Sequence, residues 1–289
     1  MIRVVSWNIA KRHDSWRELV KMDADVALVQ EGGWLPDDVS GIDVGPKESY
    51  DSHHWNSDWW KDRWSHLIER WPMVVKLSDR VDVAWFRQVS PIWGGEDDEI
   101  GVSGIGTIAA ARVTPKDGLT ESFIAVSMYA RWLGPHPSTG SSWIYGDASA
   151  HRIISDLSAF IGNENPATHR IVAAGDLNMF YGYGDGGAPY WEARYRSVFE
   201  RINAIGLEFI GPQAPNGRQA EARLPGEPSD SRNVVTYSTR SNPAEADNRQ
   251  LDFAFASRGF HESIKVRALN EVDEWGPSDH CRILIQVDG

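Results

Sequence analysis

The chain has 289 residues, of which 41% are hydrophobic and 24% charged, a balance that argues against a disordered or fibrous protein. Its formal net charge of -12, from 29 basic and 41 acidic residues, argues against a surface that binds nucleic acid over its whole extent. The one cysteine, Cys281, allows no internal disulfide, and no segment approaches the roughly 18 consecutive apolar residues of a membrane span. We therefore expect a cytoplasmic protein with no membrane partner.

Short apolar runs rich in valine and isoleucine recur along the chain. Each has the length and composition of a β-strand. In chain order, the predicted strands span residues 2–7, 26–29, 81–86, 105–111, 123–128, 171–174, 253–256 and 283–287. These runs predict a mixed α/β chain with more strand than helix.

Three segments between the predicted strands have helical spacing. In the first, Ser15 and Glu18 form a capping box, so we expect a helix that begins at Ser15. The other two place their apolar residues on one helical face and end at a glycine. They cover residues 153–161, before Gly162, and 191–205, before Gly206.

A tryptophan-rich segment, residues 55–71, also shows helical spacing. The side chains that fall on one face are Trp60, Trp64, Leu67, Ile68 and Trp71. We favour a buried amphipathic helix face as the interpretation. The alternative is an aromatic platform for bases or another flat substrate.

Two segments have the composition of loops, residues 131–147 and 211–248. The second is longer than most loops inside compact domains, and loops of this length are often functional. Polar residues that suggest chemistry lie on both sides of it, so we do not treat it as a linker. We predict a single domain over residues 1–289.

Polar side chains follow several apolar runs at the point where each run stops. Asn8 ends the first run, Glu31 ends the second, and Asp176 and Asn178 follow the run at 171–174. Strand ends hold side chains rigidly at a rim, which is where α/β enzymes tend to place their ligands. The repetition predicts one shared crevice.

Six short motifs, in a fixed order, resemble a known enzyme group. They are Ser6-Trp7-Asn8-Ile9, Leu28-Val29-Gln30-Glu31, Met128-Tyr129, Gly175-Asp176-Leu177-Asn178, Leu251-Asp252-Phe253 and Ser278-Asp279-His280. Together they resemble the motifs of the endonuclease/exonuclease/phosphatase superfamily over nearly the whole chain. The resemblance implies a DNase I-like α/β fold, a four-layered α/β/β/α sandwich. Two mixed β-sheets would pack face to face between outer helices, with the site at one end of the sheets.

The same resemblance implies a divalent-metal site. Glu31 would be a metal ligand, with Asn8 and Asp279 close to the same ion. Hard oxygen ligands of this kind suit Mg²⁺ or Mn²⁺. The cation would polarise a phosphoryl oxygen and neutralise charge that builds up at phosphorus.

Catalytic roles for five residues also follow from the resemblance. Asp176 matches the position that orients or deprotonates the attacking water, and Asn178 the position that donates to the phosphoryl oxygens. His280 would bind the scissile phosphate or transfer a proton, with Asp252 holding its imidazole in one orientation. Tyr129 matches a position near the phosphate.

Four basic side chains are further candidates for substrate binding. Arg131, His136, His151 and Arg249 lie in or near the loops that the motifs place at the rim. We predict that these side chains contact phosphate, because cationic donors bind it strongly.

The sequence therefore predicts a divalent-metal-dependent phosphodiesterase or nuclease that hydrolyses P–O bonds by in-line attack of an activated water. A phosphatase or phosphodiesterase for a small phosphorylated metabolite or lipid headgroup is the alternative. A third hypothesis is a binding protein that keeps the fold and has lost catalysis. Abasic-site enzymes usually carry an aromatic residue just before an Arg-Leu-Asp-type motif, whereas this chain has Arg249-Gln250-Leu251-Asp252. Abasic-site specificity is therefore not predicted, and no protein partner is implied.

Overall fold

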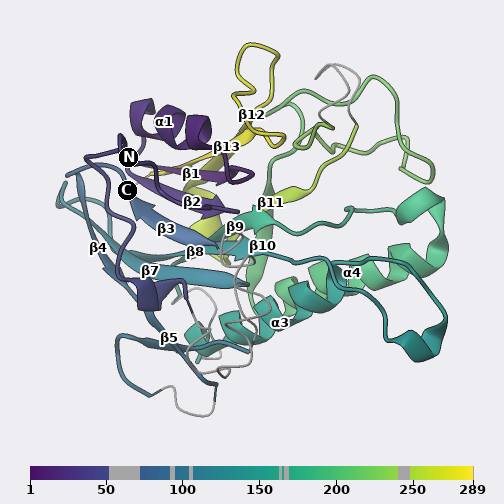
Figure 1. The fold of residues 1–289 in the computed structure, drawn as a ribbon, viewed down its shortest axis with the longest axis horizontal. Coiled ribbons are helices and arrows are strands. Elements are labelled where there is room, and N and C mark those ends of the chain that lie inside the picture. Colours follow the sequence, from purple (N-terminus) through teal and green to yellow (C-terminus); the bar gives the residue numbers. More distant parts are fainter. Residues whose placement is uncertain are drawn as a thin grey trace.

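The computed structural model describes residues 1–51, 72–91, 95–103, 107–162, 165, 169–239 and 248–288. Within these residues, two β-sheets lie face to face with helices on their outer sides (Figure 1). The first sheet has five strands, in the order β12 (Ile264–Leu269), β13 (Arg282–Val287), β1 (Ile2–Asn8), β2 (Val26–Gln30) and β3 (Met73–Lys76).

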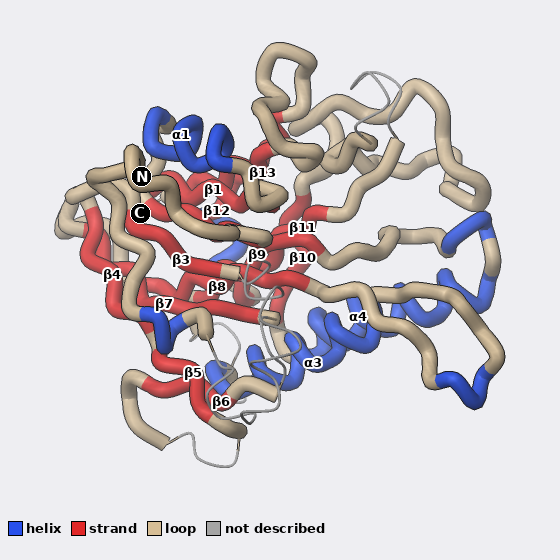
Figure 2. The backbone as a smooth tube through the Cα atoms, viewed as in Figure 1, coloured by secondary structure: helices blue, strands red, loops and turns tan. Residues whose placement is uncertain are grey.

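The second sheet has six strands, and β8 and β9 pair in parallel within it. Its order is β10 (Leu207–Gly211), β11 (Asp252–Ser257), β9 (Ile171–Asp176), β8 (Phe123–Tyr129), β7 (Ile108–Pro115) and β4 (Val81–Trp85). A small separate sheet joins β5 (Arg87–Val89) to β6 (Glu99–Gly101). In the described part of the chain, the α-helices are α1 (His13–Lys21), α3 (Asp147–Leu157) and α4 (Pro189–Ala204). Figure 2 shows long loops that extend beyond the ends of the strands.

The two-residue period of a strand explains how one sheet is buried on both faces. In β1, Val4 points into the core between the two sheets, where Leu28 and Ala174 also lie. Its neighbour Val5 points the other way and packs with Trp16 of α1. Both β1 residues are fully buried, so this strand is apolar on both faces.

Helices α3 and α4 cover the outer face of the second sheet. Ile153 and Ile154 of α3 and Val198 of α4 pack against Phe253 and Phe255 of β11. Complete burial of such a side chain contributes roughly 1.5–3 kcal/mol. The layers are therefore α1, the first sheet, the second sheet, and the α3–α4 pair, which confirms the predicted four-layered sandwich.

Each predicted strand falls on an observed strand, over the residues that the structure describes. The strands β3, β5, β6, β10 and β12 were not predicted. In β12, exposed Lys265 and Arg267 alternate with buried Val266, so the strand lacks a continuous apolar run. This alternation is typical of a strand that faces solvent on one side.

The predicted start of the first helix is wrong. Helix α1 begins at His13, two residues before Ser15, and its N-cap Arg12 makes no side-chain capping bond. Ser15 is fully buried, and Glu18 accepts a hydrogen bond from Arg282 at 2.7 Å. The long-range ion pair with β13 therefore replaces the predicted capping box.

The other two helices overlap the predicted segments, with both ends shifted. Helix α3 begins at Asp147 and ends at Leu157, where a 3-10 turn continues the chain to Phe160. Helix α4 begins at Pro189 and ends before Gly206, which has φ of +88°. The tryptophan-rich segment 55–71 lies outside the described residues. Of the helices that the structure describes, none is long and apolar enough to cross a membrane.

Gly175 allows β8 and β9 to approach each other closely beside the site. A Cβ atom added at Gly175 would overlap the carbonyl oxygen of Met128 on the neighbouring strand. Met128 and Gly175 are paired across β8 and β9 in the buried sheet, so neither backbone can move without disturbing the hydrogen bonds between these strands. The absence of a side chain here fixes the position of the next residue, Asp176.

Gly175→Ala is expected to lower the free energy of unfolding by about 1–3 kcal/mol, the usual effect of overpacking. Urea denaturation measures this change. Gly162→Ala is the matched control, because an added Cβ there meets no atom within 4 Å. Equal stability of the two variants would contradict the close approach of the strands.

Candidate active site

The ends of three neighbouring strands bring polar side chains into one row. Tyr129 at the end of β8 pairs with Asp176 at the end of β9, and Asp176 pairs with Asp252 at the start of β11. In the facing sheet, Asn8 ends β1 beside Gln30, the last residue of β2. The Nδ2 atom of Asn8 donates to Oδ2 of Asp176 at 3.1 Å, so the two sheets meet at this contact.

Two of the predicted site residues have a left-handed backbone. Glu31, directly after β2, has φ of +48°, and Asn178, two residues after β9, has φ of +50°. Asparagine adopts this conformation readily, whereas for glutamate it costs on the order of 1 kcal/mol. Strained residues of this kind cluster at functional sites. The strain at Glu31 therefore supports a functional role for this position.

Asp176 lies at the centre of the row and is 1% exposed. Its Oδ1 accepts from the backbone N–H of Asn178 at 2.8 Å, and its Oδ2 accepts from Nδ2 of Asn178 at 3.0 Å. Burial raises the pKa of Asp176 to about 7, with the positive charge of His280 opposing and the charges of Asp252 and Glu31 adding to the rise. A carboxylate with this pKa can accept a proton at neutral pH, as a general base must.

His280 is held between two carboxylates and is 4% exposed. Its Nδ1 donates to Oδ2 of Asp252 at 2.8 Å, and its Nε2 lies 3.9 Å from Oδ2 of Asp176. Burial lowers the pKa of His280, but the charge and hydrogen bond of Asp252 overcome this effect. Asp176 and Asp279 add to them and raise the pKa to about 10. The imidazole is therefore a cation at neutral pH.

Asn178 connects Asp176 to the backbone of the preceding strand end. Besides donating to Asp176, its Nδ2 donates to the carbonyl oxygen of Ala130 at 3.1 Å. Both amide hydrogens are therefore engaged in this structure. The predicted donation to a phosphoryl oxygen requires the exchange of one of these bonds when substrate binds, and it stays a prediction.

Oxygen donors from both ends of the sequence lie close to Asn8. Glu31 follows Gln30, which pairs with Asn8 across the β1–β2 ladder. Asp279 follows Ser278, whose hydroxyl donates to the backbone oxygen of Asn8 at 2.6 Å. The three predicted metal-binding residues therefore belong to one end of the first sheet.

This donor set fits a magnesium or manganese ion. Oε1 of Glu31 accepts from the Tyr129 hydroxyl at 2.9 Å, which orients the carboxylate. Oδ1 of Asn8 accepts from the N–H of Ala10 at 3.0 Å, and a carbonyl oxygen has a second lone pair. In the described part of the chain, no three His, Cys, Asp or Glu side chains form a group that could hold a metal. Mg²⁺ needs no such group, because it binds one or two carboxylates and keeps several waters.

Two of the predicted phosphate contacts lie near this row. The backbone N–H of Arg131, two residues after Tyr129, donates to the Ser149 hydroxyl at 3.1 Å. Arg249 is exposed and lines a cavity together with Asn178. Contact of either arginine with phosphate stays a prediction.

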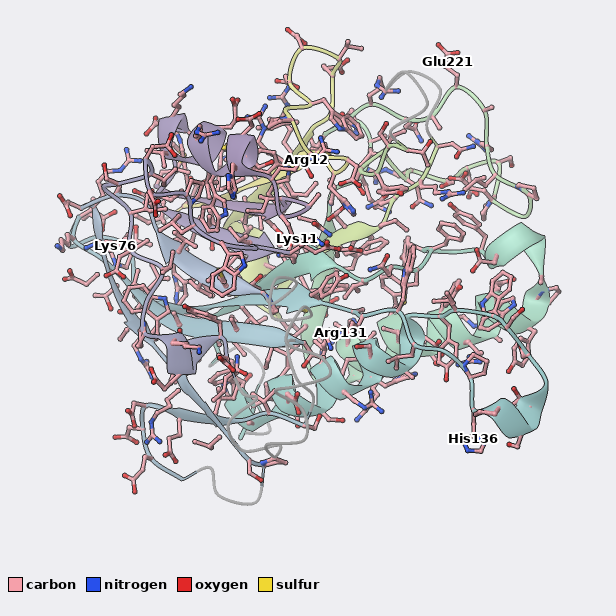
Figure 3. All side chains as sticks on the ribbon, in the orientation of Figure 1. Lys11, Arg12, Lys76, Arg131, His136 and Glu221 are labelled. Atoms are coloured by element: carbon pink, nitrogen blue, oxygen red, sulfur yellow. The ribbon has the colours of Figure 1, made fainter. Side chains whose placement is uncertain are left out.

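The two histidines of that set lie elsewhere. His136 is exposed at the outer end of the segment that follows Arg131 (Figure 3). His151 belongs to α3, and its Nε2 lies 3.2 Å from the hydroxyl of Ser197 on α4. Burial, together with the charge of Arg201, lowers the pKa of His151. This imidazole packs between two helices, and the structure does not bring it to the row.

Thr236 supports the site and was not predicted. Its hydroxyl oxygen accepts from the backbone N–H groups of Leu251 and Asp252, at 2.9 and 3.1 Å. Its own carbonyl accepts from the N–H of Cys281 at 2.9 Å, directly after His280. Thr236 therefore fixes the backbone on both sides of the Asp252–His280 contact. It lies in the loop 211–248, where neither periodicity nor composition distinguishes it.

A model of the Endonuclease/Exonuclease/phosphatase family matches residues 5–280 of this chain. A search of curated protein sequences finds no match. Solved structures with a similar fold include the endonuclease domain of TRAS1, a telomere-specific non-LTR retrotransposon. Its sequence is 13% identical, the TM-score is 0.59, and the match covers 100% of this chain and 99% of that domain.

Two further structures are similar over most of their lengths. The catalytic domain of APE2 from Xenopus laevis has a TM-score of 0.61 and 15% identity, with 99% of this chain and 91% of that one covered. The AP endonuclease LMAP from Leishmania major has a TM-score of 0.57 and 16% identity, with 100% and 88% covered. At these identities the likeness establishes the shared fold.

Thr236→Val is expected to leave the buried N–H groups of Leu251 and Asp252 without their acceptor. Each buried donor left unpaired costs about 1–3 kcal/mol, so the free energy of unfolding should fall by about 2–6 kcal/mol. Thermal unfolding measures the loss. Thr236→Ser retains the hydroxyl and serves as the matched control. If valine and serine variants unfold alike, the hydroxyl does not hold this backbone.

Proposed function

The chain belongs to the Endonuclease/Exonuclease/phosphatase family, which is composed of hydrolytic enzymes acting on phosphate esters. From this premise we propose that it is a divalent-metal-dependent phosphodiesterase acting on nucleic acid. It hydrolyses a P–O bond by in-line attack of an activated water. The fold alone does not define a substrate, so the proposal rests on the chemistry of the site.

One observation carries the proposal: a buried carboxyl group and a buried imidazole lie close together at the ends of neighbouring strands. Oδ2 of Asp176 and Nε2 of His280 are 3.9 Å apart. The other ring nitrogen of His280, Nδ1, donates a hydrogen bond to Oδ2 of Asp252 at 2.8 Å. The imidazole can donate a hydrogen bond to a phosphoryl oxygen, while the carboxylate accepts a proton from water. A phosphate ester bound beside both groups has the partners that hydrolysis needs.

In the proposed reaction, Asp176 takes a proton from the attacking water, whose oxygen forms a bond to phosphorus. The bond from phosphorus to the leaving oxygen breaks in line with this attack. The leaving oxygen takes a proton from solvent, and Asp176 returns its proton to solvent. His280 donates from Nε2 to a phosphoryl oxygen and offsets the negative charge there. Asn178 keeps Asp176 in position and, after exchange of one bond, also donates to the phosphoryl group.

Glu31, Asp279 and the amide oxygen of Asn8 would hold the metal. Mg²⁺ or Mn²⁺, when bound, supplies Lewis-acid polarisation of a phosphoryl oxygen. Tyr129 positions the Glu31 carboxylate through its 2.9 Å hydrogen bond. Its hydroxyl therefore acts on metal binding through Glu31.

A small phosphorylated metabolite or a lipid headgroup is the second candidate substrate. The net charge of -12 favours it, because a long polyanion gains affinity from each cation that neutralises a phosphate. A binding protein without catalysis is the third possibility. The complete set of catalytic residue types in one row argues against it.

Hydrolysis of bis-p-nitrophenyl phosphate and p-nitrophenyl phosphate tests the proposal directly. With Mg²⁺ or Mn²⁺, we expect faster turnover of the diester than of the monoester and loss of both activities on chelation by EDTA. Faster turnover of the monoester would identify a phosphatase instead. No turnover of either with any divalent metal would leave a binding protein.

In the same assay, Glu31→Gln is expected to raise the Mg²⁺ concentration needed for half-maximal rate by at least about tenfold. The amide has the same shape and lacks the charge that binds the cation. Asp288→Asn, which alters a surface carboxylate paired with Lys265, is the control. Unchanged metal dependence in Glu31→Gln would refute the ligand assignment.

The pH dependence of kcat/KM tests the two charged groups. The reaction needs Asp176 deprotonated and His280 protonated. The rate should therefore rise with pH through the pKa of about 7 and fall through that of about 10. Asp252→Asn removes the charge that raises both pKa values, so both limbs should move to lower pH. Descending limbs at the same pH in the wild type and this variant would contradict the assignment.

A further inference from the structure

A cavity of about 320 Å³ lies directly beside the catalytic row. Asn178, which donates to Asp176 at 3.0 Å, forms part of its wall, and Leu251, next to Asp252, forms another part. Trp132 and Trp143, in the segment between β8 and α3, form a further part of the wall. A group bound here is therefore contiguous with a phosphate bound at Asp176.

Trp143 is held in place by residues of α4. The rings of Trp143 and Trp191 stack with centroids 5.0 Å apart and an interplanar angle of 25°. The guanidinium of Arg194 lies 4.8 Å from the centre of the Trp191 ring. Arg194 in turn makes two hydrogen bonds to Asp147, of 2.8 and 3.0 Å. The plane of Trp143 is thus fixed before any ligand arrives.

Large apolar side chains are unusually exposed at this cavity. Trp132 is 60% exposed, Trp143 40% and Ile144 55%. A contiguous exposed apolar surface in a cleft marks a binding site rather than a stabilising feature. Arg249 is also exposed and lines the same cavity, so a cation accompanies the aromatic wall.

Flat aromatic rings and a guanidinium suit a planar ligand that carries a phosphate. Nucleobases stack on tryptophan whatever their identity, and arginine stacks on bases or pairs with phosphate. A paired base cannot enter such a cavity without leaving its helix, which costs unstacking energy. A sugar can place only its C–H face against Trp143, and a choline headgroup binds tryptophan by cation–π contact, whereas a base adds stacking over its whole plane.

We propose that this cavity binds an unpaired nucleobase adjacent to the scissile phosphate. The substrate class is then single-stranded nucleic acid or its short fragments. This inference rests on the proposed function, because it places the phosphate of the same nucleotide at Asp176. It also explains how an acidic protein holds its substrate, since stacking replaces part of the attraction that a duplex binder obtains from many phosphate contacts.

Calorimetric titration of the wild-type protein with adenosine 5′-monophosphate and with ribose 5-phosphate, both in Mg²⁺, measures the contribution of the base. We expect the nucleotide to bind about 5- to 150-fold more tightly, the range for stacking one base. Trp143→Ala should remove most of this preference and leave the affinity for ribose 5-phosphate unchanged. Trp132→Ala, at a more exposed position, should reduce the preference without disturbing the stack on Trp191.

Leu119→Ala is the control, because Leu119 is 83% exposed in the β7–β8 turn and does not line the cavity. Equal binding of the two ligands by the wild type would overturn the proposal, as would a preference that survives in both tryptophan variants. Failure of the proposed function gives a different result. In that case bis-p-nitrophenyl phosphate is not hydrolysed, whereas the preference for the nucleotide and its loss in the variants remain measurable.

Discussion

The hydrogen bond from Asn8 to Asp176 is the contact on which the rest of the site depends. It joins the end of the first sheet to the end of the second and places a carboxylate where water is almost excluded. A buried carboxylate is costly unless charged and polar groups compensate for it. Asn178 and His280 supply that compensation, and Asp252 in turn stabilises the charge on His280. The four-layered fold is what brings these distant segments together.

Much of this arrangement could be predicted from the sequence, because strand ends are visible as the ends of apolar runs. Asn8, Glu31 and Asp176 each stand where such a run stops. The contact between Asp252 and His280 could not be derived from patterns, since 28 residues separate them. Family resemblance suggested it, and the structure contains it. The phosphate contacts predicted for the rim loops had no such support, and His151 packs between helices instead.

The features that the sequence did not reveal depend on tertiary contacts. Thr236 lies in a polar loop, and its importance arises only because two buried N–H groups converge on its hydroxyl. The aromatic wall beside the site needs Trp143 and Trp191, which are far apart in the chain and stack only after α4 packs near the loop. In α1, a pair between Glu18 and Arg282 replaced the local capping pattern. In each case a long-range partner decided the role of the residue.

The central claim is that paired carboxylates hold His280 as a cation inside the protein. Titration of the His280 ring by nuclear magnetic resonance measures this most directly, with the signal assigned by comparison with His280→Gln. Our account predicts that the imidazole stays doubly protonated at pH 8 and loses its proton only at about pH 10. A ring that titrates at or below the ordinary histidine pKa of about 6.5 would contradict it.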